Sequence, residues 1–335
     1  MNVALIGAGY WGPNLARVFF ELPGCNLHTI CDKKRERLDS IKASFPNINT
    51  TQEYKSLLGS PELEAIAIAT EAQYHYEIAR EFLLAGKHVF VEKPLALNSK
   101  ECEDLIDTAK AKNRVLMVGH LLEYHPAVAK LKELIDSGDL GKIYYIYSQR
   151  VNLGEIRRYE NALWSFGPHD ISVVLYLLGE EPESVNALGQ SYLQENIQDV
   201  VFVNLHFKDK RMAQVHISWL DPHKIRKFTI VGSKKMAVFD DMESSEKIKI
   251  YDKGAESPGK YATYGESITL RIGDINIPKI DMKEPLKIEV QHFLECIREN
   301  KCPLSDGVDG LRVVRVLEAA QKSMENYGVL MKLEE

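Results

Sequence analysis

The chain has 335 residues, more than a single hydrophobic core usually supports, so two domains are expected. Its net charge of -6 excludes the strongly basic surface that nucleic-acid binding requires. No apolar run approaches the ~20 residues of a membrane span, and a strand-like run follows Met1 at once. We therefore expect a cytoplasmic protein that binds small molecules, not nucleic acid or a membrane.

Residues 1–120 alternate short apolar runs with amphipathic stretches. The runs predicted as buried strands are Val3–Ile6, Leu27–Cys31, Ala65–Ala69, His88–Val91 and Val115–Val118. The stretches predicted as helices are Trp11–Leu22, Lys33–Phe45, Tyr74–Ala85 and Ser99–Ala111. Such alternation is typical of βαβ units, so we predict an α/β domain built on a doubly wound parallel sheet.

The pattern changes after residue 120. A helix is predicted at Tyr124–Ser137, a strand at Lys142–Val151 and a helix at Pro168–Leu178. The strands predicted next are Val185–Gly189, Asp199–Phe207, Met212–Trp219, Lys224–Val231, Met236–Asp240 and Lys247–Tyr251. Two helices close the chain, at about Ile288–Glu299 and Asp309–Asn326. Strands in succession without crossover helices predict an α+β domain with a large, mostly antiparallel open sheet.

A G-x-G-x-x-G pattern lies between the first predicted strand and the first predicted helix. Its glycines are Gly7, Gly9 and Gly12, with Tyr10 and Trp11 between the last two. Gly7 permits a tight turn, Gly9 lets a pyrophosphate approach the backbone, and Gly12 lets strand and helix pack closely. The helix N-terminus offers unpaired N–H groups to the anion. A merely structural turn is the alternative, but the context predicts a Rossmann domain that binds a dinucleotide here.

The residues at the end of the second predicted strand bear on the type of cofactor. Asp32 stands where a carboxylate accepts hydrogen bonds from the ribose hydroxyls of NAD. Lys33, Lys34 and Arg35 follow it, and a basic group there could neutralise the additional phosphate of NADP. A solvated helix start is the simpler interpretation of these three residues. We therefore predict NAD, with NADP as the alternative, and place Asp32 and Lys33 in the cofactor site.

Two further motifs carry reactive side chains. The strand His88–Val91 runs directly into Glu92-Lys93-Pro94, at the carboxyl edge where ligands of open α/β sheets bind. The second motif is Phe166-Gly167-Pro168-His169-Asp170. Taken alone, Lys93 is as readily a surface charge as a catalytic group. Together with the glycine turn, the two motifs resemble the Gfo/Idh/MocA family of sugar and polyol oxidoreductases, and the resemblance spans essentially the whole chain.

The resemblance implies a fold and a reaction type. It implies a nicotinamide-dependent oxidoreductase, with a Rossmann domain over residues 1–120 and a domain for substrate binding and oligomer contacts over residues 121–335. The C-terminal helix is expected to be able to pack back on the first domain. A metal is not expected, because no cluster of His, Cys and carboxylate residues has ligand spacing.

The resemblance also implies two catalytic residues. The lysine of the first motif contacts the substrate hydroxyl in that family, and a cis bond often precedes its proline; these positions are Lys93 and Pro94. Many members carry an aspartate four residues before a catalytic histidine. The histidine is His169 here, but Ser165 occupies the aspartate position. Asp170 is one residue further on, and on a helix it points about 100° away, so it does not replace the missing group.

These roles define the mechanism that we expect. His169 removes the hydroxyl proton while a hydride passes to the nicotinamide, and the Lys93 ammonium stabilises the developing alkoxide; reduction is the reverse. A histidine suits proton transfer because its ordinary pKa of ~6.5 lies near neutrality. A cation fixed in place lowers the barrier by countering the developing charge.

The remaining candidates are expected beside these two residues. Those assigned to the cofactor are Thr70, His75, Glu92 and Lys93. Those assigned to the substrate are His120, Tyr124, Asn152, Arg157, Asn161 and Ser165, since guanidinium and amide groups match sugar hydroxyl, carboxylate and phosphate groups. A surface position at a helix start is the alternative for His75. A solvated loop is the alternative for residues 150–164.

Tyr124 and the loop 150–164 resemble the nucleotide-sugar 3-dehydrogenases of the family more than its inositol or glucose enzymes. This implies oxidation at C3 of a UDP-N-acetylhexosamine, or of its uronic acid, for surface-polysaccharide synthesis. The alternatives are a keto-sugar reductase, a polyol dehydrogenase, or a regulator that binds the cofactor without catalysis. The aromatic and β-branched sheet after residue 185 needs a cover, so a homodimer or homotetramer is predicted.

Overall fold

The computed structural model describes residues 1–154, 156–256 and 269–333, which form two compact units. The first unit comprises Met1–Tyr124 and Lys283–Arg315, and the second comprises His125–Met282 and Val316–Glu335. The chain therefore enters the first unit twice. Residues 283–315 carry one complete helix and the start of another into it.

The first unit contains a six-stranded sheet in which every neighbouring pair of strands is parallel. Its strands are β1 (Asn2–Ile6), β2 (Asn26–Cys31), β3 (Asn49–Thr51), β4 (Ala65–Ile68), β5 (His88–Glu92) and β6 (Leu116–Gly119). Its helices are α1 (Gly12–Glu21), α2 (Arg35–Ser44), α3 (His75–Leu84), α4 (Ser99–Lys112), α7 (Pro285–Glu299) and the first residues of α8 (Gly307–Glu325). The order β3-β2-β1-β4-β5-β6 reverses between β1 and β4. The predicted doubly wound parallel sheet is therefore confirmed, and its ligand-binding switch point lies between these two strands.

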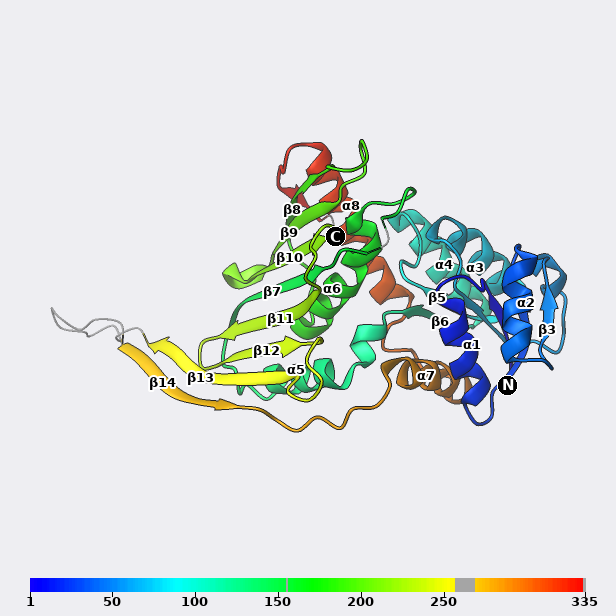
Figure 1. The fold of residues 1–335 in the computed structure, drawn as a ribbon, viewed down its shortest axis with the longest axis horizontal. Helices are drawn as coiled ribbons and strands as arrows, with labels where there is room; N and C mark the ends of the chain where they lie inside the picture. Colours follow the sequence, from blue (N-terminus) through cyan, green and yellow to red (C-terminus); the bar gives the residue numbers. More distant parts are fainter. Residues whose placement is uncertain (155, 257–268, 334–335) are drawn as a thin grey trace. The chain divides into compact units, whose positions relative to one another are not determined.

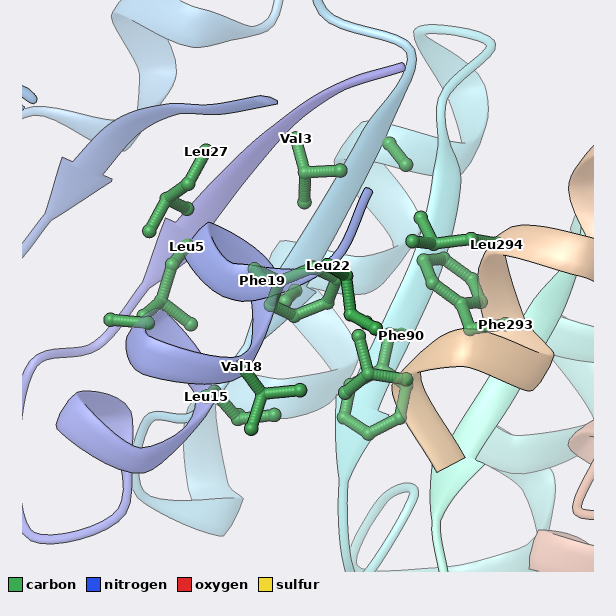
Figure 2. Close-up of a cluster of buried hydrophobic side chains, with 14 of the residues drawn as sticks. Val3, Leu5, Leu15, Val18, Phe19, Leu22, Leu27, Phe90, Phe293 and Leu294 are labelled. Carbon is green, nitrogen blue, oxygen red and sulfur yellow. The ribbon is translucent and has the colours of Figure 1, made fainter. Parts of the chain in front are cut away.

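Part of the core of this unit lies between the sheet and the helices α1 and α7 (Figure 2). Val3 and Leu5 face this core from β1, and Phe19 faces it from α1. Helix α7 adds Phe293, whose ring meets the ring of Phe90 on β5 edge-on, with 5.7 Å between the centroids. A helix from the late part of the chain thus completes the hydrophobic core around the first strand.

The second unit contains a nine-stranded sheet in the described part of the chain. Its strands are β7 (Ile143–Val151), β8 (Ser184–Gln190), β9 (Val200–His206), β10 (Met212–Ser218), β11 (Ile225–Gly232), β12 (Met236–Asp240), β13 (Ile248–Glu256), β14 (Thr269–Asn276) and β15 (Met331–Lys332). The order is β14-β13-β12-β11-β7-β10-β9-β8-β15. Strands β7 and β10 are parallel and the other neighbours are antiparallel. The predicted mostly antiparallel sheet is confirmed.

Helices cover one face of this second sheet (Figure 1). Helix α6 (Ala162–Leu178) packs on β7, β9 and β10, and α5 (Pro126–Asp136) packs on α6 and β12. On the other face, Tyr145 pairs in register with Met212, and both side chains are about 40% exposed (41% and 42%). Phe202 on that face is likewise exposed, and its ring stacks on His216. This face is aromatic, and the described helices α5 and α6 pack on the opposite one.

One predicted helix start was wrong, and three strands were missed. The helix predicted to start at Pro168 starts at Ala162, because the Asn161 side chain accepts a hydrogen bond from the Trp164 N–H at 3.1 Å and caps the helix there. Pro168 then lies inside the helix. The strands β3, β14 and β15 were not predicted. Among the described residues, no helix combines the length and apolar character needed to cross a membrane.

Candidate active site

The glycine turn follows β1 at the switch point of the first sheet. Gly7 has a φ of +99°, and a Cβ there would lie 2.4 Å from the Ala69 carbonyl oxygen at the end of β4. A Cβ on Gly12 would lie 2.2 Å from the carbonyl oxygen of Gly7. Only glycine fits at these two positions, whereas a Cβ on Gly9 would find its nearest neighbour, an Arg37 nitrogen, at 3.5 Å. The turn is thus closely packed at Gly7 and Gly12 and open at Gly9, an arrangement that fits a dinucleotide pyrophosphate.

Two alanine substitutions are expected to separate folding from cofactor binding. Gly9→Ala meets ordinary contacts, so it should unfold like the wild type, but its methyl group should weaken NADH binding at least about tenfold. Gly12→Ala forces its Cβ onto a backbone oxygen and should lower the free energy of unfolding by about 1–3 kcal/mol. Denaturant unfolding and NADH fluorescence titration measure the two effects. Equal NADH affinity in Gly9→Ala and wild type would contradict this site.

Asp32, which follows β2, stabilises the glycine turn by hydrogen bonds. Its carboxylate is 7% exposed and accepts the Ala8 N–H at 2.8 Å and the Lys34 N–H at 2.8 Å. Arg37 donates to the same carboxylate at 3.2 Å and was not predicted from the sequence. The Lys33 ammonium instead stands over the Tyr74 ring, 4.8 Å from its centroid. Asp32 therefore helps to shape the turn.

The side chains next to the turn differ in exposure. Tyr10 is 87% exposed, whereas Trp11 is partly buried and stands at the N-cap of α1. Thr70 follows β4, and its hydroxyl donates to the Glu71 carbonyl at 3.3 Å. Tyr10 is thus the side chain that the turn leaves open to a ligand.

His75 holds the lysine-bearing segment against the loop after β4. It is 1% exposed, and its Nδ1 lies 2.7 Å from the Pro94 carbonyl oxygen while its Nε2 lies 3.1 Å from the Thr70 carbonyl oxygen. The peptide bond between Lys93 and Pro94 is cis. The imidazole therefore ties together two backbone segments at the carboxyl edge of the sheet, and this places the Lys93 backbone.

Glu92 points from the end of β5 over β6. Its carboxylate atoms lie 3.1 Å from where a Cβ on Gly119 would be, so glycine at the paired position leaves room for it. Burial raises the pKa of Glu92 to about 7, against the lowering influence of Lys93 and Trp11. A carboxyl group that titrates near neutrality thus lies beside the predicted catalytic lysine.

His120 lies inside a buried group of acids. Its Nδ1 is 2.7 Å from Asp309 Oδ2 and 3.4 Å from Glu123 Oε1, and the histidine is 1% exposed. Burial alone would lower the pKa of His120, but the two acids outweigh it and raise the pKa to about 10. The imidazole is therefore a cation between Glu123, three residues further along the chain, and the distant Asp309 of α8. The donor atoms of His120, Glu123 and Asp309 lie within 4.8 Å of one another, an arrangement that sequence spacing did not indicate.

Tyr124 is also internal. Its hydroxyl lies 3.0 Å from the Ser305 hydroxyl, and its ring packs on His292 of α7 with 5.6 Å between the centroids. It is 7% exposed. The structure thus gives Tyr124 partners within the protein that fix the chain where the first unit ends.

His169 belongs to the second unit and lies partly buried on α6. The next residue, Asp170, is fully buried and pairs with Arg150 of β7, which is 6% exposed. Burial raises the pKa of Asp170, while Arg150 and Ser148 lower it. The pair anchors α6 on the sheet and fixes the helix turn from which His169 projects.

Breaking this buried pair is expected to destabilise the second unit. Asp170→Asn leaves the Arg150 guanidinium buried without a counter-ion and should cost about 3–5 kcal/mol of the free energy of unfolding. As the control, Asp136→Asn removes an exposed partner of Lys132 on α5 and should cost less than about 1 kcal/mol. Urea unfolding of both variants gives the comparison. Equal stabilities for the two would show that the buried pair does not anchor α6.

The substrate candidates of the loop before α6 have distinct environments. Asn161 is the cap of α6, and its amide nitrogen donates to Gln198 and Gln321, each at 2.9 Å. Arg157 pairs with Glu160 and keeps 43% of its side chain exposed. Asn152 is partly buried, and Ser165 is 2% exposed on α6. Of the polar groups predicted to contact substrate, Arg157 is thus the most open.

The structure brings the predicted site residues together in two groups. The glycine turn, Asp32, His75, Lys93 and His120 belong to the first unit, and His169, Asn161 and Ser165 belong to the second. Sequence reasoning missed Arg37, Arg150 and Glu289, a fully buried acid of α7. An acid at a position with an apolar helical neighbourhood was the one available signal for Glu289.

The chain matches known protein families over most of its length. Residues 1–120 match the model described as "Oxidoreductase family, NAD-binding Rossmann fold" (GFO_IDH_MocA), and residues 132–332 match its "C-terminal alpha/beta domain". An uncharacterized oxidoreductase of Streptococcus pneumoniae is 28% identical over 227 residues, which are 64% of this chain and 61% of that protein.

Other relatives match end to end. UDP-N-acetylglucosamine 3-dehydrogenase of Acidithiobacillus ferrooxidans is 24% identical over 98% of both chains. Myo-inositol 2-dehydrogenase of Thermotoga maritima is 24% identical over 100% of this chain and 99% of that protein. Among solved structures, an oxidoreductase from Magnetospirillum magnetotacticum is 30% identical, with a TM-score of 0.79 over 96% of this chain and 99% of the other.

Proposed function

Because the chain belongs to the Gfo/Idh/MocA family of NAD-dependent oxidoreductases, we propose that it oxidises a nucleotide-activated sugar, a UDP-N-acetylhexosamine or its uronic acid, at C3. The observation that carries the proposal is the carboxyl edge of the first sheet. There the glycine turn, closed at Gly7 and Gly12, lies at the switch point, and His75 holds the backbone of Lys93 at the same edge. The end-to-end similarity to a UDP-N-acetylglucosamine 3-dehydrogenase supports the substrate class.

The proposed mechanism assigns a role to each of two side chains. The residues of the glycine turn would hold NAD, which would supply the acceptor for the hydride of the carbinol carbon. The His169 imidazole takes the hydroxyl proton as the carbonyl forms, and the Lys93 ammonium stabilises the negative charge that develops on the oxygen. Lys93 belongs to the first unit and His169 to the second.

We propose that the cofactor site is lined by the glycine turn together with Tyr10, Trp11, Asp32, Thr70 and Glu92. We favour NAD over NADP, because the Asp32 carboxylate stands at the end of β2 and would repel a 2′-phosphate. Arg37, which contacts that carboxylate, is a further candidate to bind such a phosphate. Titration with NADH and NADPH in parallel tests this preference.

Purified protein incubated with NAD and a panel of substrates tests the proposed function. Reduction of NAD, followed by its absorbance, is expected with UDP-N-acetylglucosamine or its uronic acid and not with free inositols. Reduction with an inositol would instead support a polyol dehydrogenase, which the similarity to myo-inositol 2-dehydrogenase makes the second candidate. NADH oxidation by a keto-sugar alone would support a reductase. Binding of NADH without turnover of any substrate would support a regulator.

We also propose that the protein is a homodimer or homotetramer in the cytoplasm that serves polysaccharide synthesis. The aromatic face of the second sheet, with Tyr145 and Met212 about 40% exposed (41% and 42%), supports an assembly through that face. Sedimentation at micromolar concentration tests the assembly, and a monomer would contradict it.

A further inference from the structure

Glu289 is a buried acid that the proposed mechanism does not use. It lies on α7 and is 0% exposed. Neither of its carboxyl oxygens has a hydrogen-bond partner within the part of the chain that the structure describes. A buried carboxylate without a donor is costly, so such a group calls for a physical explanation.

The packing of α7 on the sheet places Glu289 toward Glu92. Phe90 and Glu92 are two residues apart on β5 and share one face of the sheet. Glu289 and Phe293 are one helical turn apart and share one face of α7. Since the rings of Phe90 and Phe293 are in contact, the neighbouring positions bring the two acids together. Burial raises the pKa of Glu289 well above its ordinary value, and Glu92 is the charged group that adds most to this effect.

Charged groups from several elements form this cluster, and the cations among them contact acids other than Glu289. The acids are Glu92, Glu123, Glu289 and Asp309, and the cations are Lys93, His120 and Arg312. His120 contacts Asp309 and Glu123, and an Arg312 nitrogen lies 3.9 Å from Asp309. Lys93 is adjacent to Glu92 in the chain and favours the ionised form of that acid. His120 also favours the ionised form of Glu289, but burial and Glu92 outweigh this influence and keep the pKa of Glu289 raised.

We propose that Glu289 is a neutral, protonated carboxylic acid that acts as a positioning residue for Lys93. Because Glu289 holds the proton, Glu92 remains ionised and is the carboxylate beside that lysine. If Glu92 and Glu289 were both ionised, their charges would repel each other, and one proton on either acid removes this repulsion. Glu289 keeps the proton since it faces no donor, while Glu92 has an ammonium next to it. The role of Lys93 in this inference rests on the proposed function, but the protonation of Glu289 does not.

Infrared spectroscopy of the full-length protein tests where the proton is. The carbonyl stretch of a neutral carboxylic acid is compared in wild type, Glu289→Gln, Glu92→Gln and the control Glu299→Gln, an exposed acid of the same helix. In mildly alkaline buffer, where Glu92 is ionised, Glu289→Gln is expected to lose the part of this band that Glu289 contributes, and Glu92→Gln and Glu299→Gln are expected to keep that part; Glu123, whose pKa is raised to about 8, contributes the remainder. A spectrum of Glu289→Gln that retains the whole band would overturn the proposal. The amide is close to the acid in size, so folding is preserved.

Chemical labelling tests which acid carries the charge that acts on Lys93. Acylation of Lys93 by acetic anhydride is measured by mass spectrometry relative to exposed Lys100 in the same sample. Only the neutral amine reacts, so Glu92→Gln should speed labelling of Lys93 about tenfold, whereas Glu289→Gln should leave it unchanged. The opposite pattern of labelling rates would show that Glu289 carries the negative charge and would contradict the proposal. No substrate is needed, so a failed dehydrogenase assay and a failed labelling result are distinguishable.

Elemental analysis tests the alternative that a bound metal ion, and not a proton, compensates the charge of the acids. A bound cation at His120, Glu123 and Asp309 would supply the charge in place of the proton. The dialysed protein is expected to contain no stoichiometric metal. One equivalent that is retained in Glu299→Gln and lost in Glu289→Gln would overturn the proton assignment.

Discussion

Lys93→Met is expected to lower the turnover number about 10³-fold while NADH affinity stays within about twofold. The ammonium would act on charge that develops only as the hydroxyl proton leaves, so its loss affects the transition state more than the ground state. Methionine keeps the length of the side chain and removes the charge. The contacts of His75 with Pro94 and Thr70 involve main-chain oxygens, so they survive the substitution.

The control for this prediction is Lys100→Met on α4. Lys100 is an exposed lysine near the same segment and should tolerate the change with full activity. Stopped-flow measurement of NAD reduction at saturating UDP-N-acetylglucosamine, with NADH titration in parallel, gives both quantities. A Lys93→Met enzyme with wild-type turnover would remove Lys93 from the chemistry.

His169→Ala is expected to lower the turnover number about 10²–10⁴-fold, the usual contribution of a general base. The loss should be largest near neutral pH and smaller at high pH, because hydroxide then removes the substrate proton without help. The wild-type rate of oxidation should rise with pH as the imidazole loses its proton. This rise should be absent in the variant.

An exposed histidine of the second unit gives the matched control. His223→Ala should leave both the rate and its pH dependence unchanged. Profiles of turnover against pH for the two variants and the wild type are the measurement. If His169→Ala keeps the wild-type profile, another group is the base, and the serine at position 165 becomes the first place to look for the reason.

Local patterns were sufficient to predict the sheet that carries the cofactor site. Gly12 packs on the nearby Gly7 carbonyl, so the strand and helix beside it along the chain were enough to predict the turn, whereas the contact of Gly7 with Ala69 of β4 is distant in sequence. The alternation of strands and helices likewise predicted the parallel sheet, and the later run of strands predicted the antiparallel one. These features depend on residues within a few positions of each other, which a sequence displays directly.

The buried electrostatics could not be predicted in the same way. His120 meets Asp309 across 189 positions of the chain, and no spacing rule links them. The pairing of Asp170 with Arg150 was not predicted, because it depends on how α6 packs on β7. Asn161 was predicted to contact substrate, whereas its amide is used for a helix cap and two glutamine contacts. Such pairings exist only once the tertiary structure has formed.

The discontinuous composition of the first unit has a consequence for biosynthesis. Its central strands leave the ribosome early, but Phe293 and the rest of α7 emerge only after about 280 residues have been made. Until then the side of β1 and β5 that α7 covers is open to water. A nascent chain truncated near residue 120 should therefore stay bound to chaperones or aggregate, and a fragment designed for cofactor studies would need residues 283–315 joined to it.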